Sequence, residues 1–479
     1  PLRLVGSEMC IRDRVYTMPE FLERRYNPQS RTILSVISLV SYVLTKVAVT
    51  VYAGGLVFQQ VFGIKELWGI DFFWIAAIGL VVLTALYTIF GGMKSVLYTS
   101  VLQTPILLLG SLIILVLGFK ELGGWDEMMR VCGAVTVNDY GDTMTNLIRS
   151  NDDANFPWLG ALIGSAIIGF WYWCTDQFIV QRVLSGKNEM EARRGTIFGA
   201  YLKLLPVFLF LIPGMIAFAL HQKYIGAGGE GFLPMLANGT ANADAAFPTL
   251  VAKLLPAGVK GLVVCGILAA LMSSLASLFN SSAMLFTIDF YKRFKPETPE
   301  KKLVGIGQIA TIVIVVLGIL WIPIMRSVGD VLYTYLQDVQ SVLAPGIAAA
   351  FLLGICWKRT SAQGGMWGLI SGMVIGLTRL GAKVYYSNAG EVADSTFKYL
   401  FYDMNWLFFC GWMFLFCIIV VIVVSLATEA PTAEKIQGLV FGTATKEQKA
   451  ATRASWNHWD IIHTVIILAI TAAFYWYFW

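Results

Sequence analysis

The sequence predicts an all-α protein, a polytopic bundle of membrane-spanning helices. Of its 479 residues, 57% are hydrophobic and only 14% are charged, whereas soluble globular chains carry about 25% charged residues. The apolar residues also gather into long runs, and a bilayer core about 30 Å thick needs about 20 apolar residues per helix. A soluble protein of this size would need more polar surface, so the composition indicates a membrane protein.

Eleven apolar runs have the length of a membrane span. In chain order they occupy residues 32–62, 71–90, 95–119, 157–181, 196–221, 257–288, 303–325, 331–356, 365–382, 404–427 and 460–478. Along the span 365–382, glycines recur every four residues, at Gly364, Gly368, Gly372 and Gly376. Such a face of small residues lets another helix approach closely, so we expect it to pack rather than to bind a ligand.

Basic residues predict how these spans are oriented. Lysine and arginine gather in the loops 24–31, 182–194, 292–302 and 358–359 and at Lys94, which all fall on one side when the spans alternate. By the positive-inside rule this side is cytoplasmic. We therefore expect a protein of the cell inner (plasma) membrane whose acidic segment 120–156, segment 222–256 and carboxyl terminus lie outside. The net charge of +5 is spread over short loops and does not indicate a nucleic-acid partner.

Residues 1–14, PLRLVGSEMCIRDR, fit neither a signal peptide nor the start of a span. The run VGSEMCIRDR resembles a translated sequencing-adapter read-through. We therefore expect residues 1–14 to be a non-native artefact and residues 15–479 to form a single transmembrane domain.

Sequence signals of enzymes and metal proteins are missing. The seven cysteines have no spacing typical of disulfide or zinc frameworks, and the three histidines form no HExxH motif or cluster. No GxxxxGK[ST] nucleotide loop is present, and no nucleophile, base and orienting group can be assembled from spacing. We therefore expect a protein that is not an enzyme.

Polar side chains inside a span are costly unless they line a cavity or a pathway. Tyr42, Thr45, Lys46 and Thr50 lie at spacings of three and four and form one polar stripe on the first span. Lys46 can pair with carbonyls or an acid of a neighbouring helix, which we favour, or contact a ligand. Lys203 lies about 12 Å inside its span, and both pairing and ligand binding remain open for it.

The span 157–181 combines aromatic rings with an acid. Trp171, Tyr172 and Trp173 are consecutive, and Asp176 follows four residues after Tyr172, on the same predicted helix face. Gly169 removes a side chain from that face. The rings can pack inside the bundle or line a cavity, and the pattern favours neither alternative.

Hydroxyl and amide groups mark two later spans. On the span 257–288, small residues form one stripe at Ala270, Ser273, Ser274, Ser277 and Ser281. This stripe can pack tightly, which is the usual role, or offer oxygens to a hard cation. On the span 331–356, Gln337, Gln340 and Ser341 share one side, and we expect Pro345 and Gly346 to break the helix beyond them. Interrupted helices are typical of ion and substrate sites in membrane transporters.

Two runs resemble a known family. Residues 171–182, WYWCTDQFIVQR, resemble the signature of the sodium/glucose cotransporters of the solute:sodium symporter family, and residues 273–291, SSLASLFNSSAMLFTIDFY, resemble its second signature. The similarity runs from about Tyr16 to Arg359. It implies a leucine-transporter-type inverted-repeat fold and Na+-coupled symport of a glucose- or galactose-like monosaccharide into the cell by alternating access.

The resemblance also implies roles for single residues. Tyr172 matches a tyrosine that covers the sugar as an inner gate, and Trp173 matches its neighbour. Lys203 and Gln337 match residues that hydrogen-bond sugar hydroxyls. The Na+ ligands are matched by Ala270, through its carbonyl, and by Ser273 and Ser274. Na+ is the implied coupling ion, and the implied partners are a small sugar, Na+ and the lipid bilayer, with no obligate protein partner.

Three departures from the family pattern bear on function. Gly169 stands where the family has a polar residue, and Ser100 stands where it usually has an aspartate linked to cation coupling. The family's first helices, which complete both sites, would precede Tyr16. We therefore expect three helices to be missing, and the chain as written not to transport.

Other functions stay open. A symporter of the same fold for myo-inositol, sialic acid or a carboxylate is the nearest alternative, although Lys203 with Gln337 favours a neutral polyhydroxyl solute. A non-transporting sensor or a channel is a further alternative, but no signalling domain follows the last span and no repeated filter residues are visible.

Overall fold

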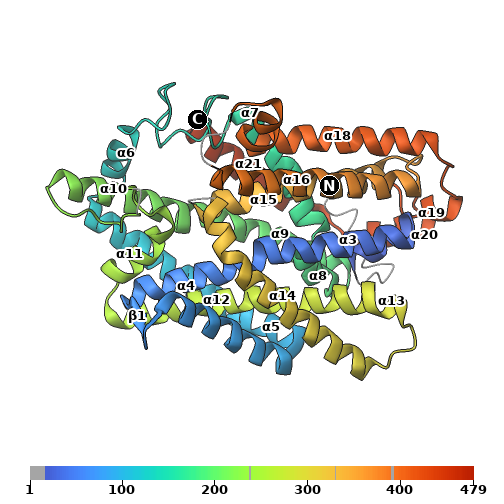
Figure 1. The fold of residues 1–479 in the computed structure, drawn as a ribbon, viewed down its shortest axis with the longest axis horizontal. Helices are drawn as coiled ribbons and strands as arrows, with labels where there is room; N and C mark the ends of the chain where they lie inside the picture. The colour runs from blue at the N-terminus through green and yellow to red at the C-terminus, as the bar shows by residue number, and fades with distance from the viewer. Residues whose placement is uncertain (1–16, 237–238, 329–330, 390–392, 479) are drawn as a thin grey trace. The chain divides into compact units, whose positions relative to one another are not determined.

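The computed structural model describes residues 17–236, 239–328, 331–389 and 393–478, most of them helical (Figure 1). The predicted artefact 1–14 lies outside these residues. Within them, the helices that are long and apolar enough to cross a membrane are Pro28–Phe62, Gln103–Leu122, Trp158–Thr175, Glu189–Gly226, Ala257–Phe294, Lys301–Met325, Leu332–Cys356, Trp406–Ala427 and His458–Tyr477. The predicted all-α membrane bundle is confirmed.

The chain forms two compact units, each assembled from segments that are distant in sequence. The first unit comprises residues 1–45, 151–199 and 281–469, and the second comprises residues 46–150, 200–280 and 470–479. Four helical elements belong in part to each unit: η1 (Tyr42–Val47), α9 (Glu189–Pro206), α12 (Ala257–Met284) and α21 (His458–Tyr477).

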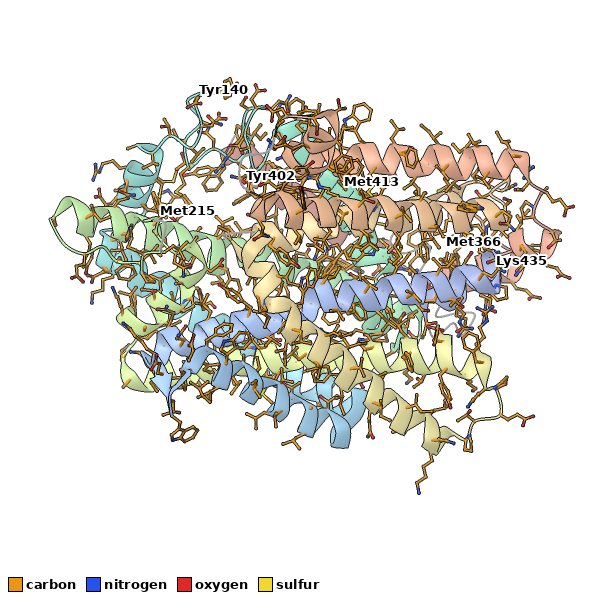
Figure 2. The ribbon with its side chains drawn as sticks, viewed as in Figure 1. Tyr140, Met215, Met366, Tyr402, Met413 and Lys435 are labelled. Carbon is orange, nitrogen blue, oxygen red and sulfur yellow. The ribbon has the colours of Figure 1, made fainter. Side chains whose placement is uncertain are left out.

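In the described part of the first unit, all the regular elements are helices. Its remaining elements are α2 (Met18–Arg25), α3 (Pro28–Ser41), α7 (Trp158–Phe170), η2 (Trp171–Thr175), α8 (Gln177–Leu184), η5 (Leu285–Tyr291), α13 (Lys292–Phe294), α14 (Glu300–Val328), α15 (Leu332–Cys356), α16 (Ala362–Asn388), α17 (Thr396–Lys398), η6 (Tyr399–Asp403), α18 (Trp406–Ala427), α19 (Ala433–Ile436) and α20 (Lys446–Ser455). Lys435 of α19, labelled in Figure 2, donates to the Glu23 carbonyl of α2 at 2.9 Å.

Helices α15, α16 and α18 form the centre of the first unit, and α16 and α18 lie side by side in Figure 1. The predicted glycine face makes this packing possible. A Cβ at Gly372 would lie 2.6 Å from the Gly346 Cα of α15, and a Cβ at Gly368 would clash with Val421 of α18. The packing role expected for the glycines is confirmed.

The second unit contains the rest of the helices and a short β-hairpin. Its elements are α4 (Ala48–Phe62), β1 (Glu66–Leu67), β2 (Ile70–Asp71), α5 (Phe72–Leu122), α6 (Trp125–Gly133), η3 (Val207–Leu211), α10 (Ile212–Gly226), η4 (Ala243–Ala245) and α11 (Ala246–Leu254). The two strands are antiparallel, with Leu67 opposite Ile70.

Helices α5, α6, α10, α11 and α12 share one apolar core in the second unit. Cys132 of α6 is fully buried in this core, and its Sγ donates to the carbonyl of Met215 (labelled in Figure 2) at 3.7 Å. Burial raises the pKa of the Cys132 thiol to about 11. The thiol is therefore protonated at neutral pH and acts as a small apolar side chain.

Two predicted spans, 71–90 and 95–119, are wrong as separate helices. The structure has one helix of 51 residues, α5, across both. Gly91 and Gly92 lie between the two predicted spans, and glycine costs a helix only about 1 kcal/mol each because it keeps its backbone N–H. The pair therefore does not end the helix.

The predicted break at Pro345 is also wrong, because α15 continues through it. Proline has the φ of a helix but costs a helix interior about 3 kcal/mol, and a membrane helix tolerates it where neighbouring groups satisfy the freed carbonyl. Gly346 then lies against Gly372, so the small residues serve close packing. The interruption occurs instead in the predicted span 157–181, at Asp176, where the backbone is extended (φ −76°, ψ 119°).

The α15–α16 packing can be tested by overpacking. We expect Gly372→Leu to destabilise the protein by about 1–3 kcal/mol, because the new side chain must displace α15. Gly381→Leu is the matched control, since a Cβ at that position on α16 meets nothing within 4 Å. Thermal unfolding in detergent micelles measures both, and equal stability of the two variants would contradict the packing role.

Candidate functional site

The break at Asp176 divides one membrane-length segment into two helices. Helix α7 passes into the π-helical η2, the Asp176 N–H donates to the Trp171 carbonyl at 3.0 Å, and α8 begins at Gln177. The Asp176 carboxylate caps α8 by accepting from the Phe178 N–H at 3.2 Å. Polar backbone is tolerated at membrane depth only where such partners satisfy it, so the acid is part of what makes the break possible.

Asp176 is held from a second helix. The hydroxyl of Tyr42 in η1 donates to Asp176 Oδ1 at 3.2 Å, and the two side chains are 0% and 4% exposed. The acid therefore points to Tyr42 and to the start of α8, and the regular helix face predicted for Tyr172 and Asp176 is wrong. The cause is the extended backbone at Asp176, which ends the helical periodicity there.

Thr45 and Lys46, which follow Tyr42 in the predicted polar stripe, are both buried. Thr45 donates to the Ser41 carbonyl on its own helix at 2.6 Å. This is a local back-bond of a hydroxyl in a helix. Lys46, in the second unit, is 8% exposed.

Gln177 anchors the start of α8. Its Oε1 accepts from the Met18 N–H of α2 at 2.9 Å, and its Nε2 donates to the Met284 Sδ at 3.7 Å. Both contacts lie within the first unit. The start of α8 is thus held by the backbone of α2 and by the side chain of Met284.

Three predicted substrate residues lie in the first unit, on elements that pack together. Tyr172 and Trp173 of η2 are partly buried, and their rings meet edge to face with centroids 5.1 Å apart. Element η2 packs against α15, which carries Gln337. The Gln337 Nε2 donates to the Tyr333 hydroxyl on its own helix at 2.9 Å. A Cβ at Gly169 of α7 would meet nothing within 4 Å, so this position has room for a side chain.

The fourth predicted substrate residue lies in the second unit. Lys203 is exposed on α9, three residues before Pro206, where the helix passes into the π-helical η3.

The predicted cation ligands Ala270, Ser273 and Ser274 also lie in the second unit, on α12. Ser273 is buried, and its hydroxyl lies 2.6 Å from that of Ser100 on α5. The Ser277 hydroxyl donates to the Ser273 carbonyl at 3.0 Å. Ser100, which stands at the family's usual aspartate position, and Ser273, an implied Na+ ligand, are therefore direct neighbours.

This face of α12 offers neutral oxygens. A helical carbonyl such as that of Ala270 keeps a second lone pair beyond its backbone hydrogen bond, and a serine hydroxyl can accept from a neighbour and still bind a cation. Hard cations prefer such oxygen ligands. The residues present therefore fit a monovalent cation, with Ser100 supplying a hydroxyl instead of a carboxylate.

A buried charge cluster next to Gln337 was missed by the sequence analysis. Asp338 forms an ion pair with Lys383 of α16, and Asp338 Oδ1 lies 3.7 Å from Nη2 of the fully buried Arg379. The sequence carried a signal, since an acid inside a span is itself a functional hypothesis. Its partners could not be identified from spacing because they lie 41 and 45 residues away.

A second buried ion pair also escaped the sequence analysis. Arg31 Nε donates to Oδ1 of the fully buried Asp289 at 2.8 Å, and Arg31 Nη1 binds Glu23 Oε2 at 2.6 Å. The Thr17 hydroxyl donates to the same Asp289 oxygen at 3.0 Å. This network ties α2, α3 and η5 together inside the first unit.

Comparison with known proteins identifies relatives of this architecture. The model of the sodium:solute symporter family matches residues 2–372. The chain is 34% identical over 499 residues to a sodium/mannose cotransporter of Bos taurus, which covers 100% of the chain and 82% of the relative. It is 35% identical over 445 residues to sodium/myo-inositol cotransporter 2 of Homo sapiens, with 90% of the chain and 65% of the relative covered.

A sodium/glucose cotransporter is similar to the chain to the same degree. The chain is 36% identical over 436 residues to sodium/glucose cotransporter 1 of Ovis aries, with 88% of the chain and 65% of the relative covered. The chain therefore spans less than two thirds of the length of the myo-inositol and glucose relatives.

Solved structures share the fold. A Na+-coupled sialic acid symporter in its substrate-bound, outward-open state superposes with a TM-score of 0.63 at 20% identity, covering 90% of this chain and 84% of that one. The leucine-transporter-type fold expected from the sequence is confirmed.

Proposed function

Because the chain belongs to the sodium:solute symporter family, we propose that the full-length protein couples the inward movement of Na+ to that of a monosaccharide of the glucose or galactose type. Members of this family are transporters and not enzymes. The observation that carries the proposal is the helix break at Asp176, which follows directly on the Tyr172–Trp173 pair. Discontinuous helices of this kind hold substrate and ion sites at mid-membrane in secondary transporters.

The substrate residues match the chemistry of a sugar. Its hydroxyls need dense donors and acceptors, and its C–H face rests favourably on an aromatic ring. Tyr172 and Trp173 supply the rings, and Lys203 and Gln337 supply the polar groups. We assign Tyr172 the role of an inner gate that covers the bound sugar.

Na+ is the proposed coupling ion, held by the Ala270 carbonyl and by Ser273 and Ser274. One Na+ that crosses about 100 mV releases about 2.3 kcal/mol, and a tenfold concentration gradient adds about 1.4 kcal/mol. Together these sustain a sugar gradient of roughly 500-fold. Alternating access requires that Na+ favour the outward-open state, because a ligand of equal affinity for both states shifts neither.

Mannose and myo-inositol are the alternative substrates. The relatives named for these solutes are as similar to the chain as the glucose relatives, at 34% to 36% identity. The polyhydroxyl class is common to all of these substrates.

The protein is a multi-pass membrane protein. We propose the cell inner membrane as its location, with the carboxyl terminus outside. This orientation follows the positive-inside rule, by which loops rich in lysine and arginine, such as 182–194 and 292–302, face the cytoplasm.

The direct test is uptake by the full-length protein in proteoliposomes. An inward Na+ gradient should raise the uptake of labelled glucose, galactose, mannose or myo-inositol at least tenfold over an equal gradient of choline. An ionophore that collapses the Na+ gradient should abolish the stimulation. Uptake that is the same in Na+ and choline would remove the symporter proposal.

Gln337→Ala should raise the apparent sugar constant about tenfold and leave the Na+ constant within twofold. The expected size is that of one lost hydrogen bond in a site built for hydroxyls, about 1–3 kcal/mol. Gln363→Ala, an exposed glutamine in the first turn of α16, is the control. Equal shifts of the two constants in the Gln337 variant would reassign this residue to packing.

Ser274→Ala should raise the apparent Na+ constant at least fivefold, because one cation oxygen is lost at a cost of about 1 kcal/mol. Ser282→Ala removes a hydroxyl from the same helix, and the buried Ser282 Oγ has no hydrogen-bond partner among the described residues. This control should leave the Na+ constant unchanged. An unaltered Na+ response in the Ser274 variant would make the serine stripe structural.

A further inference from the structure

We propose that the ion pair between Asp338 and Lys383 is a positioning device that fixes Gln337, and that it thereby sets the affinity for the sugar and the choice among its hydroxyl configurations. The inference rests on the proposed function, in which Gln337 contacts the sugar. It starts from a charge cluster next to that residue. Every contact that carries it lies within the first unit.

The cluster joins two helices through buried charges. Asp338 Oδ2 of α15 pairs with Lys383 Nζ of α16. Asp338 is 7% exposed and Arg379, one turn before Lys383, is 0% exposed. Lys383 Nζ makes the shortest contact with this carboxylate among the described residues, because Asp338 Oδ1 lies 3.7 Å from Arg379 Nη2.

Arg379 has its own partners, so it is not free to replace Lys383. Its Nη2 donates to the Met404 carbonyl at 2.7 Å and its Nη1 to the Leu400 carbonyl at 3.3 Å, both in or just after η6. Its guanidinium lies 4.0 Å from the centre of the Phe409 ring of α18. The guanidinium is therefore committed to η6 and α18, and its charge reaches Asp338 only through space.

Element η6 has a second contact with α16. Tyr402, labelled in Figure 2, packs its ring on that of Tyr386 with centroids 5.5 Å apart. The part of α16 that carries Lys383 is therefore held in place by the contacts of Arg379 and by this ring contact. A residue can position another only if it is itself held rigidly.

A separate contact fixes the same part of α15 from another side. The Tyr335 hydroxyl accepts from Trp321 Nε1 of α14 at 2.6 Å and donates to the Leu44 carbonyl of η1 at 2.9 Å. Tyr335 and Asp338 are one turn apart on α15. Together they determine the rotation of this part of the helix about its axis.

Gln337 lies between these two fixed positions in sequence but on another side of the helix. Successive residues of an α-helix are about 100° apart, so Gln337 is turned by about 100° from Asp338. Its described hydrogen bond runs to Tyr333 on the same helix. The direction in which the amide points therefore follows the rotation of α15, which Asp338 and Lys383 control.

The energetics favour a positioning role over a stabilising one. Replacing a buried ion pair by apolar residues of similar volume is often neutral or stabilising, while removal of one partner is strongly destabilising. Stability alone therefore does not explain why a charged pair lies at this place. A positioning role explains it, because a misplacement of about 1 Å of a binding group strongly reduces the activity of a site.

The test separates these roles with a double variant. Asp338→Asn leaves Lys383 without its anion and should lower both stability and sugar affinity. Asp338→Leu combined with Lys383→Met removes both charges and should restore the unfolding temperature of the parent. In the double variant we expect an apparent sugar constant raised at least tenfold, an Na+ constant within twofold of the parent, and a changed preference between glucose and galactose.

Two controls accompany the double variant. Asp394→Asn breaks an exposed Asp–Lys pair of the same unit and should change none of these quantities. Asp338→Glu keeps the charge and should recover at least half of the lost affinity. A double variant with parental stability and a parental sugar constant would overturn the proposal, as would equal shifts of the sugar and Na+ constants.

A labelling measurement distinguishes failure of this inference from failure of the proposed function. Gln337→Cys is reacted with a membrane-impermeant thiol reagent, with and without the double variant, and the unsubstituted protein gives the background. If the pair positions this residue, its removal changes the reaction rate at least threefold, whatever solute the protein carries. An unchanged rate overturns the positioning role, whereas a changed rate with no effect of Gln337→Ala on the sugar constant overturns only the assignment of Gln337 to the sugar.

Discussion

The structure depends on one constraint, that polar groups within the membrane spans must find partners inside the protein. The break at Asp176 meets it with three hydrogen bonds. The Asp176 N–H reaches Trp171, and its carboxylate accepts from Phe178 and Tyr42. An interrupted helix is thereby possible in an apolar segment, and with it a place where polar groups can meet a solute.

The same constraint explains why charge and close packing occur together on α16. Its glycines bring the α15 backbone close, with Gly346 lying against Gly372. On the same helix, Arg379 and Lys383 face Asp338. Buried charges need partners at short range, and a close helix pair provides that range.

The candidate cation face of α12 contains neutral polar groups instead of buried charges. Ser100 and Ser273 bring two hydroxyls within 2.6 Å, with the carbonyl oxygens of α12 beside them. Neutral oxygens of this kind are ligands that hard cations prefer.

The sequence by itself determined the membrane class, the glycine packing face and the family, because long apolar runs, a period of four and the runs 171–182 and 273–291 are local signals. Only the tertiary structure decided that Pro345 continues its helix while Asp176 ends one. A proline is tolerated in a membrane helix where neighbouring groups satisfy the freed carbonyl, whereas the carboxylate at the Asp176 break also accepts from Tyr42, which is 134 residues away. For the same reason the partners of Asp338 came from the structure alone: which buried charge meets which is set by helix packing over distances that no spacing rule spans.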